Sequence, residues 1–437
     1  MAGSAALKVL AVAAICGLVA ACGGTGVKQA QPGSGSGTVV LWAHDGTAAE
    51  NSAIQQAVTN FDNQKNGVTV NLSFIPSATY TQTVTNTPVS SLPDMLEFDG
   101  PTMAGFVFAG KLSPVTDFLS QATIGDQTDS VTAQDTYRGQ RYGISLIDSG
   151  LALYGNKTML DAAGVHYPTS WQDAWTAADF TVALEKLAAH TPTGLALDVQ
   201  QNGFTGEWPA YGFLPIVSST GNVVVRDNTA QGNLNNGKVI AAISQFAGWR
   251  RYIDPNTDGN AFTAGRVALS WIGHWLYPTY HQALGDALAV LPLPDFGAGA
   301  KTGQGSWAWG ISANSRNAKA AGAFLDYLAG DPVVTAYTNA DGAPPGTKTV
   351  LATDPLYKPG GPLELYSQAL QHSCGTGTPG PGCVSAPRPV TPAYPVISEQ
   401  FGTVIREALG GGDVAALLGH AVAAIDLAYQ QNNNYGQ

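Results

Sequence analysis

The sequence predicts an α/β protein in which strands and helices alternate along most of the chain. One observation is the length, since 437 residues are ample for a large core and for two to three domain-sized units. A second is a complete strand–helix–strand pattern near the start, followed by further alternation of the same kind. Because strands joined through helices lie parallel to one another, this pattern predicts mainly parallel sheets.

The first strand–helix–strand unit shows three patterns in turn: an apolar run, a helical spacing and a strand alternation. Residues 39–42 form a short apolar run rich in β-branched side chains, which is typical of a buried strand. Apolar side chains then recur at spacings of three and four over residues 53–61, which predicts a helix that ends at Asn66-Gly67. Residues 68–74 alternate between apolar and polar side chains, which predicts a second strand.

The later elements are assigned by the same patterns, and no internal repeat interrupts them. Strands are expected at 93–98, 151–154, 266–272, 288–293 and 307–311, a hairpin at 137–144, and helices at 102–109, 157–163, from 171, at 180–190, 239–253, 318–329, 398–408 and 413–430.

The N-terminus has the character of an export signal. Lys8 precedes an apolar run over residues 9–21, which is too short to span a bilayer. The run ends in Val-Ala-Ala-Cys22, which resembles the lipobox of bacterial lipoproteins and implies cleavage before Cys22 and lipid (palmitate) attachment to its sulfur. The alternative is a plain secretory signal with an incidental cysteine. Residues 22–37 are expected to form a flexible tether.

The cysteines and the net charge indicate an oxidising compartment and argue against some classes of ligand. In an oxidising compartment Cys374 and Cys383 are expected to form a disulfide, whereas a metal site would need more ligands than His372 adds. Only 12% of residues are charged, the formal net charge is −11, and no Lys/Arg run is present. This balance argues against a nucleic-acid partner, which requires a clustered basic face.

An ordered series of short motifs resembles the extracellular solute-binding proteins of bacterial ABC importers, in the carbohydrate-binding group that includes maltose-binding protein. Two positions depart from the family pattern: Ser145 follows Ile144 where the family has Pro, and the segment at 154–157 is one residue longer. The motifs are the first strand–helix–strand, Pro93-Asp94 with Gly110-Lys111-Leu112, residues 137–143, 153–157 with Ala163-Gly164, 168–173, 262–269, 318–328, and Arg388-Pro389 with Tyr394.

The resemblance implies a two-lobe periplasmic-binding-protein fold with a ligand cleft between the lobes and a three-strand hinge. The first lobe is expected to comprise residues 38–147 and 308–355, and the second residues 150–305 and 356–437. The three crossings are expected near residues 146–150, 306–309 and 351–359.

Most candidate ligand contacts follow predicted strands, because ligands of open α/β sheets lie at the carboxyl ends of strands. Glu207 and Trp208 are expected in a Gly-rich loop over residues 205–209, and Arg388 follows the disulfide loop. Carboxylates accept hydrogen bonds from sugar hydroxyls, Arg donates a fixed fork, and Trp covers the apolar face of a pyranose. Core packing, helix capping and surface salt bridges are the alternatives for individual side chains, and Tyr80 enters through its position in the family. The candidates are His44, Asp45, Tyr80, Asp99, Asp148, Ser149, Glu207, Trp208, Trp271, His274, Trp275, Ser306, Trp307 and Arg388.

The expected function is that of a substrate-binding subunit that captures a carbohydrate and delivers it to ABC permease subunits by lobe closure. The acidic candidates favour a neutral or positively charged ligand such as an amino sugar. We expect a monomer on the outer face of the cell membrane, attached through lipid alone, with no catalysis, cofactor or metal. The alternatives are an exported glycoside hydrolase, or the same fold with a glycerophosphodiester or polyamine ligand.

Overall fold

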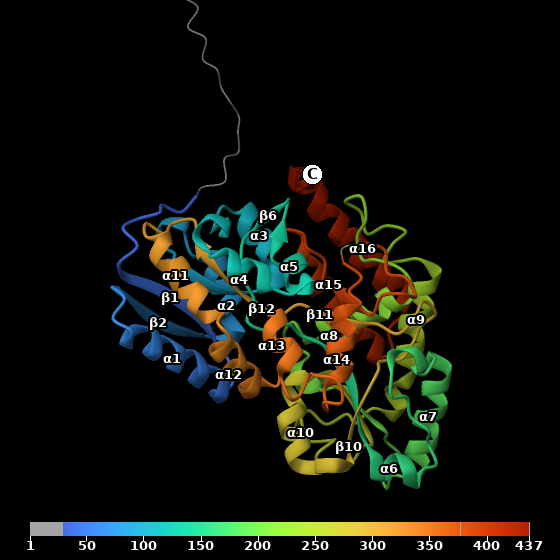
Figure 1. Cartoon of the computed structure of the whole chain (residues 1–437). Helices are drawn as coiled ribbons and strands as arrows, with labels where there is room; N and C mark the ends of the chain where they lie inside the picture. The colour runs from blue at the N-terminus through green and yellow to red at the C-terminus, as the bar shows by residue number, and fades with distance from the viewer. Residues whose placement is uncertain (1–28, 376, 437) are drawn as a thin grey trace, which may run out of the picture.

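The computed structural model describes residues 29–375 and 377–436, in which two separate sheets each carry their own helices (Figure 1). The predicted signal peptide, Cys22 and the first part of the tether lie outside the described residues. In the first sheet the order is β2 (Val68–Pro76), β1 (Gly37–Asp45), β3 (Met95–Asp99), β12 (Trp307–Ser312) and β4 (Leu112–Ser113). In the second it is β10 (Leu288–Leu291), β7 (Leu151–Asn156), β9 (Leu269–Gly273) and β8 (Leu197–Asp198).

The first lobe is built around the parallel pair of β1 and β2, which are in register over their whole lengths. Helix α1 begins with a capping box, in which the Thr47 hydroxyl accepts from the Glu50 amide and the Glu50 carboxylate accepts from the Thr47 amide. Buried side chains such as Leu41 and Phe324 join the sheet to its helices. These helices are α1 (Ala48–Asn63), α2 (Ser77–Asn86), α3 (Met103–Phe108), α11 (Ala318–Leu328) and α12 (Asp331–Asp341).

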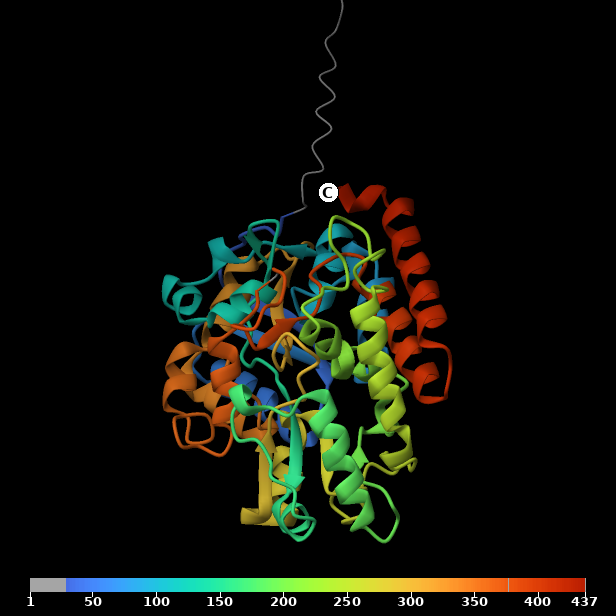
Figure 2. The same ribbon diagram turned by 90° about the vertical axis from the view of Figure 1, so that its right-hand side faces the viewer.

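The second lobe packs its helices into one continuous core with β7 and β9, to which Phe213, Trp249 and Ile425 contribute. The last two helices of the chain, α15 and α16, pack against each other, and α16 runs along the outside of this lobe beside α9 (Figure 2). Its helices are α6 (Lys157–Ala162), α7 (Ala177–Ala189), α8 (Trp208–Ser219), α9 (Gly237–Gly248), α10 (Tyr277–Leu284), α15 (Tyr394–Leu409) and α16 (Val414–Gln431).

Three extended segments lie side by side where the chain passes between the lobes. Ile144 exchanges both backbone hydrogen bonds with Trp309, at 3.0 and 2.8 Å. The Asp148 amide donates to the Pro344 carbonyl at 2.7 Å, and the Gly346 amide to the Leu146 carbonyl at 2.9 Å. The segment beside the first crossing is therefore 344–346, just before helix α13 (Lys348–Thr353), upstream of the expected third crossing at 351–359.

Smaller elements complete the fold. The predicted hairpin is present as β5 and β6, and its turn uses Arg138 and Gly139 with φ of 50° and 75°. The remaining elements are α4 (Gln121–Asp126), α5 (Asp129–Gln134), β5 (Thr136–Tyr137), β6 (Gln140–Arg141), β11 (Thr302–Gln304), α14 (Glu364–Gln371) and β13 (Ser385–Pro387).

Two expectations about the elements were wrong. The sheets are mixed rather than mainly parallel, because β12 pairs antiparallel with β3, and β7 pairs antiparallel with β9 and β10. A strand that enters its sheet directly from the hinge runs opposite to strands that return through a helix. Trp208 and Pro209, which were expected to lie in a Gly-rich loop over residues 205–209, instead begin α8, with Pro209 in the first turn, where proline is tolerated.

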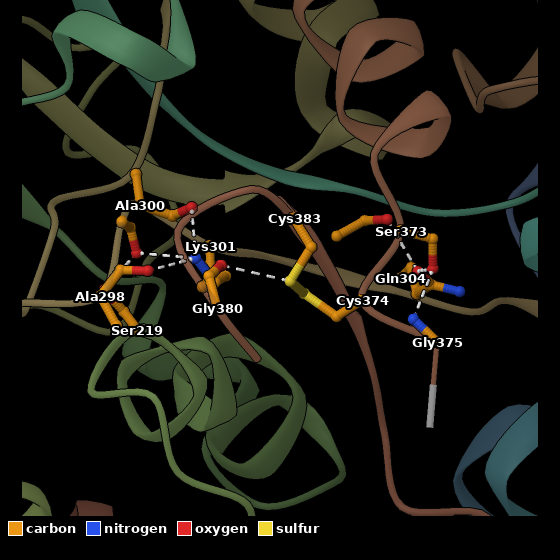
Figure 3. Close-up of a disulfide and its surroundings, with 12 residues drawn as sticks. Ser219, Ala298, Ala300, Lys301, Gln304, Ser373, Cys374, Gly375, Gly380 and Cys383 are labelled. Carbon is orange, nitrogen blue, oxygen red and sulfur yellow. Dashed lines mark hydrogen bonds between the residues drawn. A yellow bond between two sulfur atoms is a disulfide. The ribbon is translucent and has the colours of Figure 1, made fainter. Parts of the chain in front are cut away.

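The disulfide between Cys374 and Cys383 is confirmed, with the two Cα atoms 4.9 Å apart, so these sulfurs do not serve as metal ligands (Figure 3). The base of this loop is held by Gln304, whose side-chain oxygen accepts from the hydroxyls of Ser373 and Ser385, both at 2.7 Å. The loop therefore anchors β13, which runs directly into Arg388. Within residues 29–375 and 377–436, no helix combines the length and apolarity needed to cross a membrane.

Candidate ligand-binding cleft

A cavity of about 480 Å³ lies between the two lobes and is lined by both. The first lobe contributes the loop after β1, the ends of β3 and α12, and the start of β12. The second contributes the start of α8 and the segment after β9. The lining residues are Asp45, Gly46, Thr47, Glu50, Ser77, Asp99, Ile147, Ser149, Glu207, Trp208, Tyr211, His274, Trp275, Gly305, Ser306, Trp307, Asp341 and Arg388.

The structure brings most of the sequence candidates together in this cavity. They come from positions far apart in the chain, which supports the rule that ligand sites lie at strand ends. Those that line it are Asp45, Asp99, Ser149, Glu207, Trp208, His274, Trp275, Ser306, Trp307 and Arg388, and those that do not are His44, Tyr80, Asp148 and Trp271.

His44 and Tyr80 lie behind the cavity and position Trp307. The His44 ring stacks on the Trp307 ring with centroids 3.9 Å apart, and the Tyr80 ring meets it edge-on at 5.7 Å. Nδ1 of His44 lies 2.8 Å from the buried Glu97 carboxylate. Burial alone would lower the pKa of His44, but this carboxylate leaves it raised. The Tyr80 hydroxyl donates to the Trp42 carbonyl at 3.0 Å, so neither ring is free for a ligand.

Asp148 and Trp271 have structural positions instead. The Asp148 carboxylate is fully buried in the hinge and accepts from the amides of Gly305 at 2.8 Å and Ser149 at 2.7 Å. Burial raises the pKa of Asp148, against the effect of these hydrogen bonds. Trp271 is fully buried in the second-lobe core, where its indole donates to the Gly212 carbonyl at 3.0 Å.

Arg388 forms the floor of the cleft and joins both lobes. Its guanidinium makes a bidentate ion pair with Asp99, at 2.8 and 2.6 Å, and a third contact with Glu207 at 3.1 Å. It also donates to the Gly305 carbonyl at 3.0 Å and lies over the Tyr211 ring at 4.5 Å. Asp99 ends β3 in the first lobe and Glu207 precedes α8 in the second, so one cation bridges two carboxylates across the cleft.

Three tryptophans give the cleft its aromatic surface, since Trp208, Trp275 and Trp307 are all half-buried and line the cavity. Trp208 and Trp275 meet edge to face at 5.9 Å. Trp275 lies back over its own strand, and a Cβ at Gly273 would come within 2.0 Å of its ring. Glycine at 273 is therefore required by this ring position.

Two carboxylates that the sequence interpretation missed, Glu50 and Asp341, also line the cavity. In the sequence, Glu50 is the last residue of a Thr-x-x-Glu capping box, a pattern that predicts a helix-capping role rather than a ligand contact. Asp341 is the last residue of α12, a helix that the sequence interpretation did not include, although Gly342 after it is a typical helix stop. Burial, and then the Glu50 carboxylate, raise the pKa of Asp341 to about 8.

Ser149, His274 and Asp341 lie in a row without forming a catalytic relay. His274 Nε2 is 3.1 Å from the Ser149 hydroxyl, but its Nδ1 is 3.7 Å from the Asp341 carboxylate, beyond hydrogen-bond distance. Burial lowers the pKa of His274 to about 3, so its ring stays neutral. The Ser149 hydroxyl also accepts from Tyr211 at 2.7 Å.

The cleft is acidic overall. The five carboxylates that line it face a single guanidinium, and this one is shared between two of them. In the part of the chain that the structure describes, no group of three potential ligands is arranged to hold a metal ion.

Comparison with known proteins agrees with this geometry. Residues 56–360 match the family described as bacterial extracellular solute-binding protein. The fold is similar to the GacH receptor of Streptomyces glaucescens, solved unliganded and with acarbose, with a TM-score of 0.71 and 21% identity over 91% of this chain and 98% of that one. It is also similar to the Listeria monocytogenes protein Lmo0181 in complex with cycloalternan, with a TM-score of 0.75 and 18% identity over 90% and 99%. For the maltotriose-binding protein of Thermus thermophilus the TM-score is 0.68 with 20% identity over 89% and 99%. The chain therefore belongs to the family of bacterial extracellular solute-binding proteins.

Proposed function

We propose that this protein is the substrate-binding subunit of an ABC importer, and that it captures a carbohydrate carrying an amino group in the cleft between its lobes. The observation that carries the proposal is the combination of three tryptophans with five carboxylates around one cavity of about 480 Å³. Aromatic faces suit the apolar side of a pyranose, and carboxylates accept from hydroxyl and ammonium groups. Lobe closure around the ligand and delivery to permease subunits complete the proposed cycle.

The structural neighbours support a sugar as the ligand class, since the three compared above were solved with acarbose, cycloalternan and maltotriose. The acidic lining extends this to a cationic sugar, because no lysine or second arginine among the described lining residues offsets the carboxylates. A phosphate-bearing ligand would need such a cation, and Arg388 is already engaged by Asp99 and Glu207.

Calorimetric titration of the full chain against neutral sugars, amino sugars, a glycerophosphodiester and a polyamine tests this proposal. We expect binding of at least one sugar and a large loss of affinity in Trp307→Ala, which removes the ring from the cleft. A matched control is Trp175→Ala, since Trp175 does not line the cavity. Tight binding of the phosphodiester and of no sugar would overturn the proposal.

An exported glycoside hydrolase is the rival function. Such enzymes use one carboxyl group as a free acid and a second as nucleophile or base. Here Asp99 and Glu207 both bind Arg388, which argues against these roles. Incubation with oligosaccharides followed by product analysis decides the matter, since turnover that is lost in Asp99→Asn or Glu207→Gln would favour the enzyme.

Attachment to the membrane through lipid on Cys22 is part of the same proposal. We expect palmitate labelling of the exported protein and its release into the medium in Cys22→Ser. A labelled or membrane-bound Cys22→Ser protein would contradict it.

A further inference from the structure

We propose that Asp341, flanked by Glu50, forms a subsite of the cleft that binds a protonated amino group of the ligand. This inference rests on the proposed function and locates the feature that would separate an amino sugar from a neutral one. Its elements are the C-terminus of α12 and the first turn of α1, which line the same cavity as Arg388 and its two carboxylate partners, Asp99 and Glu207.

The Asp341 side chain is largely buried, but its carboxylate opens into the cavity and has no donor among the described residues. The residue is only 7% exposed and lines the cavity, yet no hydrogen bond from any described residue reaches either of its oxygens. The nearest candidate, His274 Nδ1, is 3.7 Å away on a neutral ring. Buried carboxylates in folded proteins are ordinarily hydrogen-bonded or paired, so this one lacks a partner that a ligand could supply.

A second carboxylate, that of Glu50, acts on Asp341, and His44 offsets part of its effect. The Glu50 carboxylate from α1 contributes to the raised pKa of Asp341, and His44 opposes it. His44 itself is held against the Glu97 carboxylate. Glu50 Oε2 and His44 Nε2 lie 2.7 and 3.0 Å from the position that a Cβ on Gly46 would occupy. The absence of a side chain at Gly46 therefore allows both groups to approach the loop after β1.

The position of Asp341 within its helix is also unfavourable without a ligand. The C-terminus of a helix carries partial negative charge, which disfavours a carboxylate and favours a cation. Asp341 is the last residue of α12, and Gly342 with φ of 69° ends the helix. A residue that violates a local rule without a structural gain is expected at a functional site.

An ammonium group meets the requirements of this pocket. It carries three donors and one positive charge, so it can serve two carboxylates at once. Because the pKa of Asp341 is about 8, its carboxyl group is largely protonated near neutral pH without a ligand, and a bound ammonium group would favour the ionised form. A hydroxyl or an acetamide carries no charge and would not have this effect. Asp99 and Glu207 are already paired with Arg388 and do not need a cation from the ligand.

The test compares disaccharides that differ only at one substituent. The full chain is titrated near neutral pH with cellobiose, the free-amine disaccharide of chitosan and its N-acetylated form, and with glucose and glucosamine. We expect the free amine to bind about tenfold or more tightly than the hydroxyl or acetamide partner, the range of a charged hydrogen bond. In Asp341→Asn this preference falls to within about threefold.

The control is Asp331→Asn, the same substitution at the exposed first residue of the same helix, which should leave the amine preference unchanged. Equal affinity for amine and neutral sugars, or an equal loss of both in Asp341→Asn, would overturn the subsite. Spermidine is titrated in parallel. If spermidine binds in an Asp341-dependent manner and no sugar binds, the sugar proposal fails while the ammonium subsite stands.

Discussion

Arg388 shows how much a single buried side chain can decide in this molecule. It is 6% exposed, and its charge serves Asp99 from one lobe and Glu207 from the other. Removing one partner of a buried ion pair leaves an uncompensated charge, which is more harmful than removing the whole pair.

We therefore expect Arg388→Met to lower the free energy of unfolding by about 3–5 kcal/mol. Denaturant unfolding with fluorescence detection measures it. Arg251→Met is the control, because Arg251 pairs with Glu185 on the surface at 63% side-chain exposure and should change stability by less than about 1 kcal/mol. Similar effects of the two substitutions would mean that the Arg388 cluster contributes no more than a surface pair.

For Asp341 we predict that a substitution increases stability at high pH, the opposite of the effect expected at Arg388. The pKa of its carboxyl group is about 8 in the folded protein, whereas the ordinary value for an aspartate is 3.8, so the folded state binds the proton more tightly than the unfolded chain. Stability from this group is fully present below about pH 4, falls as the pH rises from there, and is gone above about pH 8.

Asp341→Asn removes this dependence. Relative to the variant, the native protein should lose on the order of 2–5 kcal/mol between about pH 5 and pH 9, so the variant is the more stable protein at alkaline pH. Thermal unfolding across this range measures the difference. Parallel pH profiles for both proteins would contradict the prediction.

At the level of elements, the cleft is built from the ends of strands that belong to both sheets. β3 ends at Asp99, β9 ends at Gly273 and β12 begins at Trp307, and each end delivers side chains to the cavity. The position of the Trp275 ring depends on Gly273 having no side chain. The ring folds back over the strand, 2.0 Å from where a Cβ on Gly273 would lie.

Gly273→Ala should displace the Trp275 ring and weaken sugar binding by about tenfold or more, with a change in tryptophan fluorescence. Gly248→Ala is the matched control, because a Cβ there meets no atom within 4 Å. Unchanged affinity and emission in Gly273→Ala would show that the ring can lie elsewhere without consequence.

At the scale of the whole molecule, the lobes touch away from the hinge through the end of the chain. Tyr435 is buried, its carbonyl accepts from Arg138 Nη2 at 2.6 Å, and its ring meets Phe108 edge-on at 5.1 Å. Arg138 and Phe108 belong to the first lobe, whereas Tyr435 follows α16 of the second. The contact stabilises the relative arrangement in which both lobes line the cavity.

Tyr435→Ala should therefore weaken binding of the preferred sugar by about three- to tenfold, the worth of one aromatic pair. Titration measures the affinity, and small-angle scattering the accompanying change in dimensions. Leu427→Ala is the control, since Leu427 is a half-exposed apolar residue on α16. Lower stability with unchanged affinity would show that the contact serves folding alone.

Local sequence patterns predicted the elements around the cleft because those patterns report burial on one face. The apolar run before Asp45 and the strand ending at Asp99 were found in this way. Trp271 and Trp275 could not be separated, since a four-residue spacing is the same for a core side chain and a cleft side chain. The structure separates them, because Trp271 lies within β9 facing the core while Trp275 follows its end.

The α/β character, the strand ends that carry polar and aromatic residues, and the oxidised cysteine loop all follow from the amino-acid sequence alone. Each of these features depends on residues that lie only a few positions apart in the sequence. The pairing of Arg388 with Asp99, 289 residues away, and the position of Asp341 beside Glu50 without a donor emerge only from the folded chain. Such contacts arise when two sheets are packed on either side of a hinge, and no local periodicity records which side chains then meet.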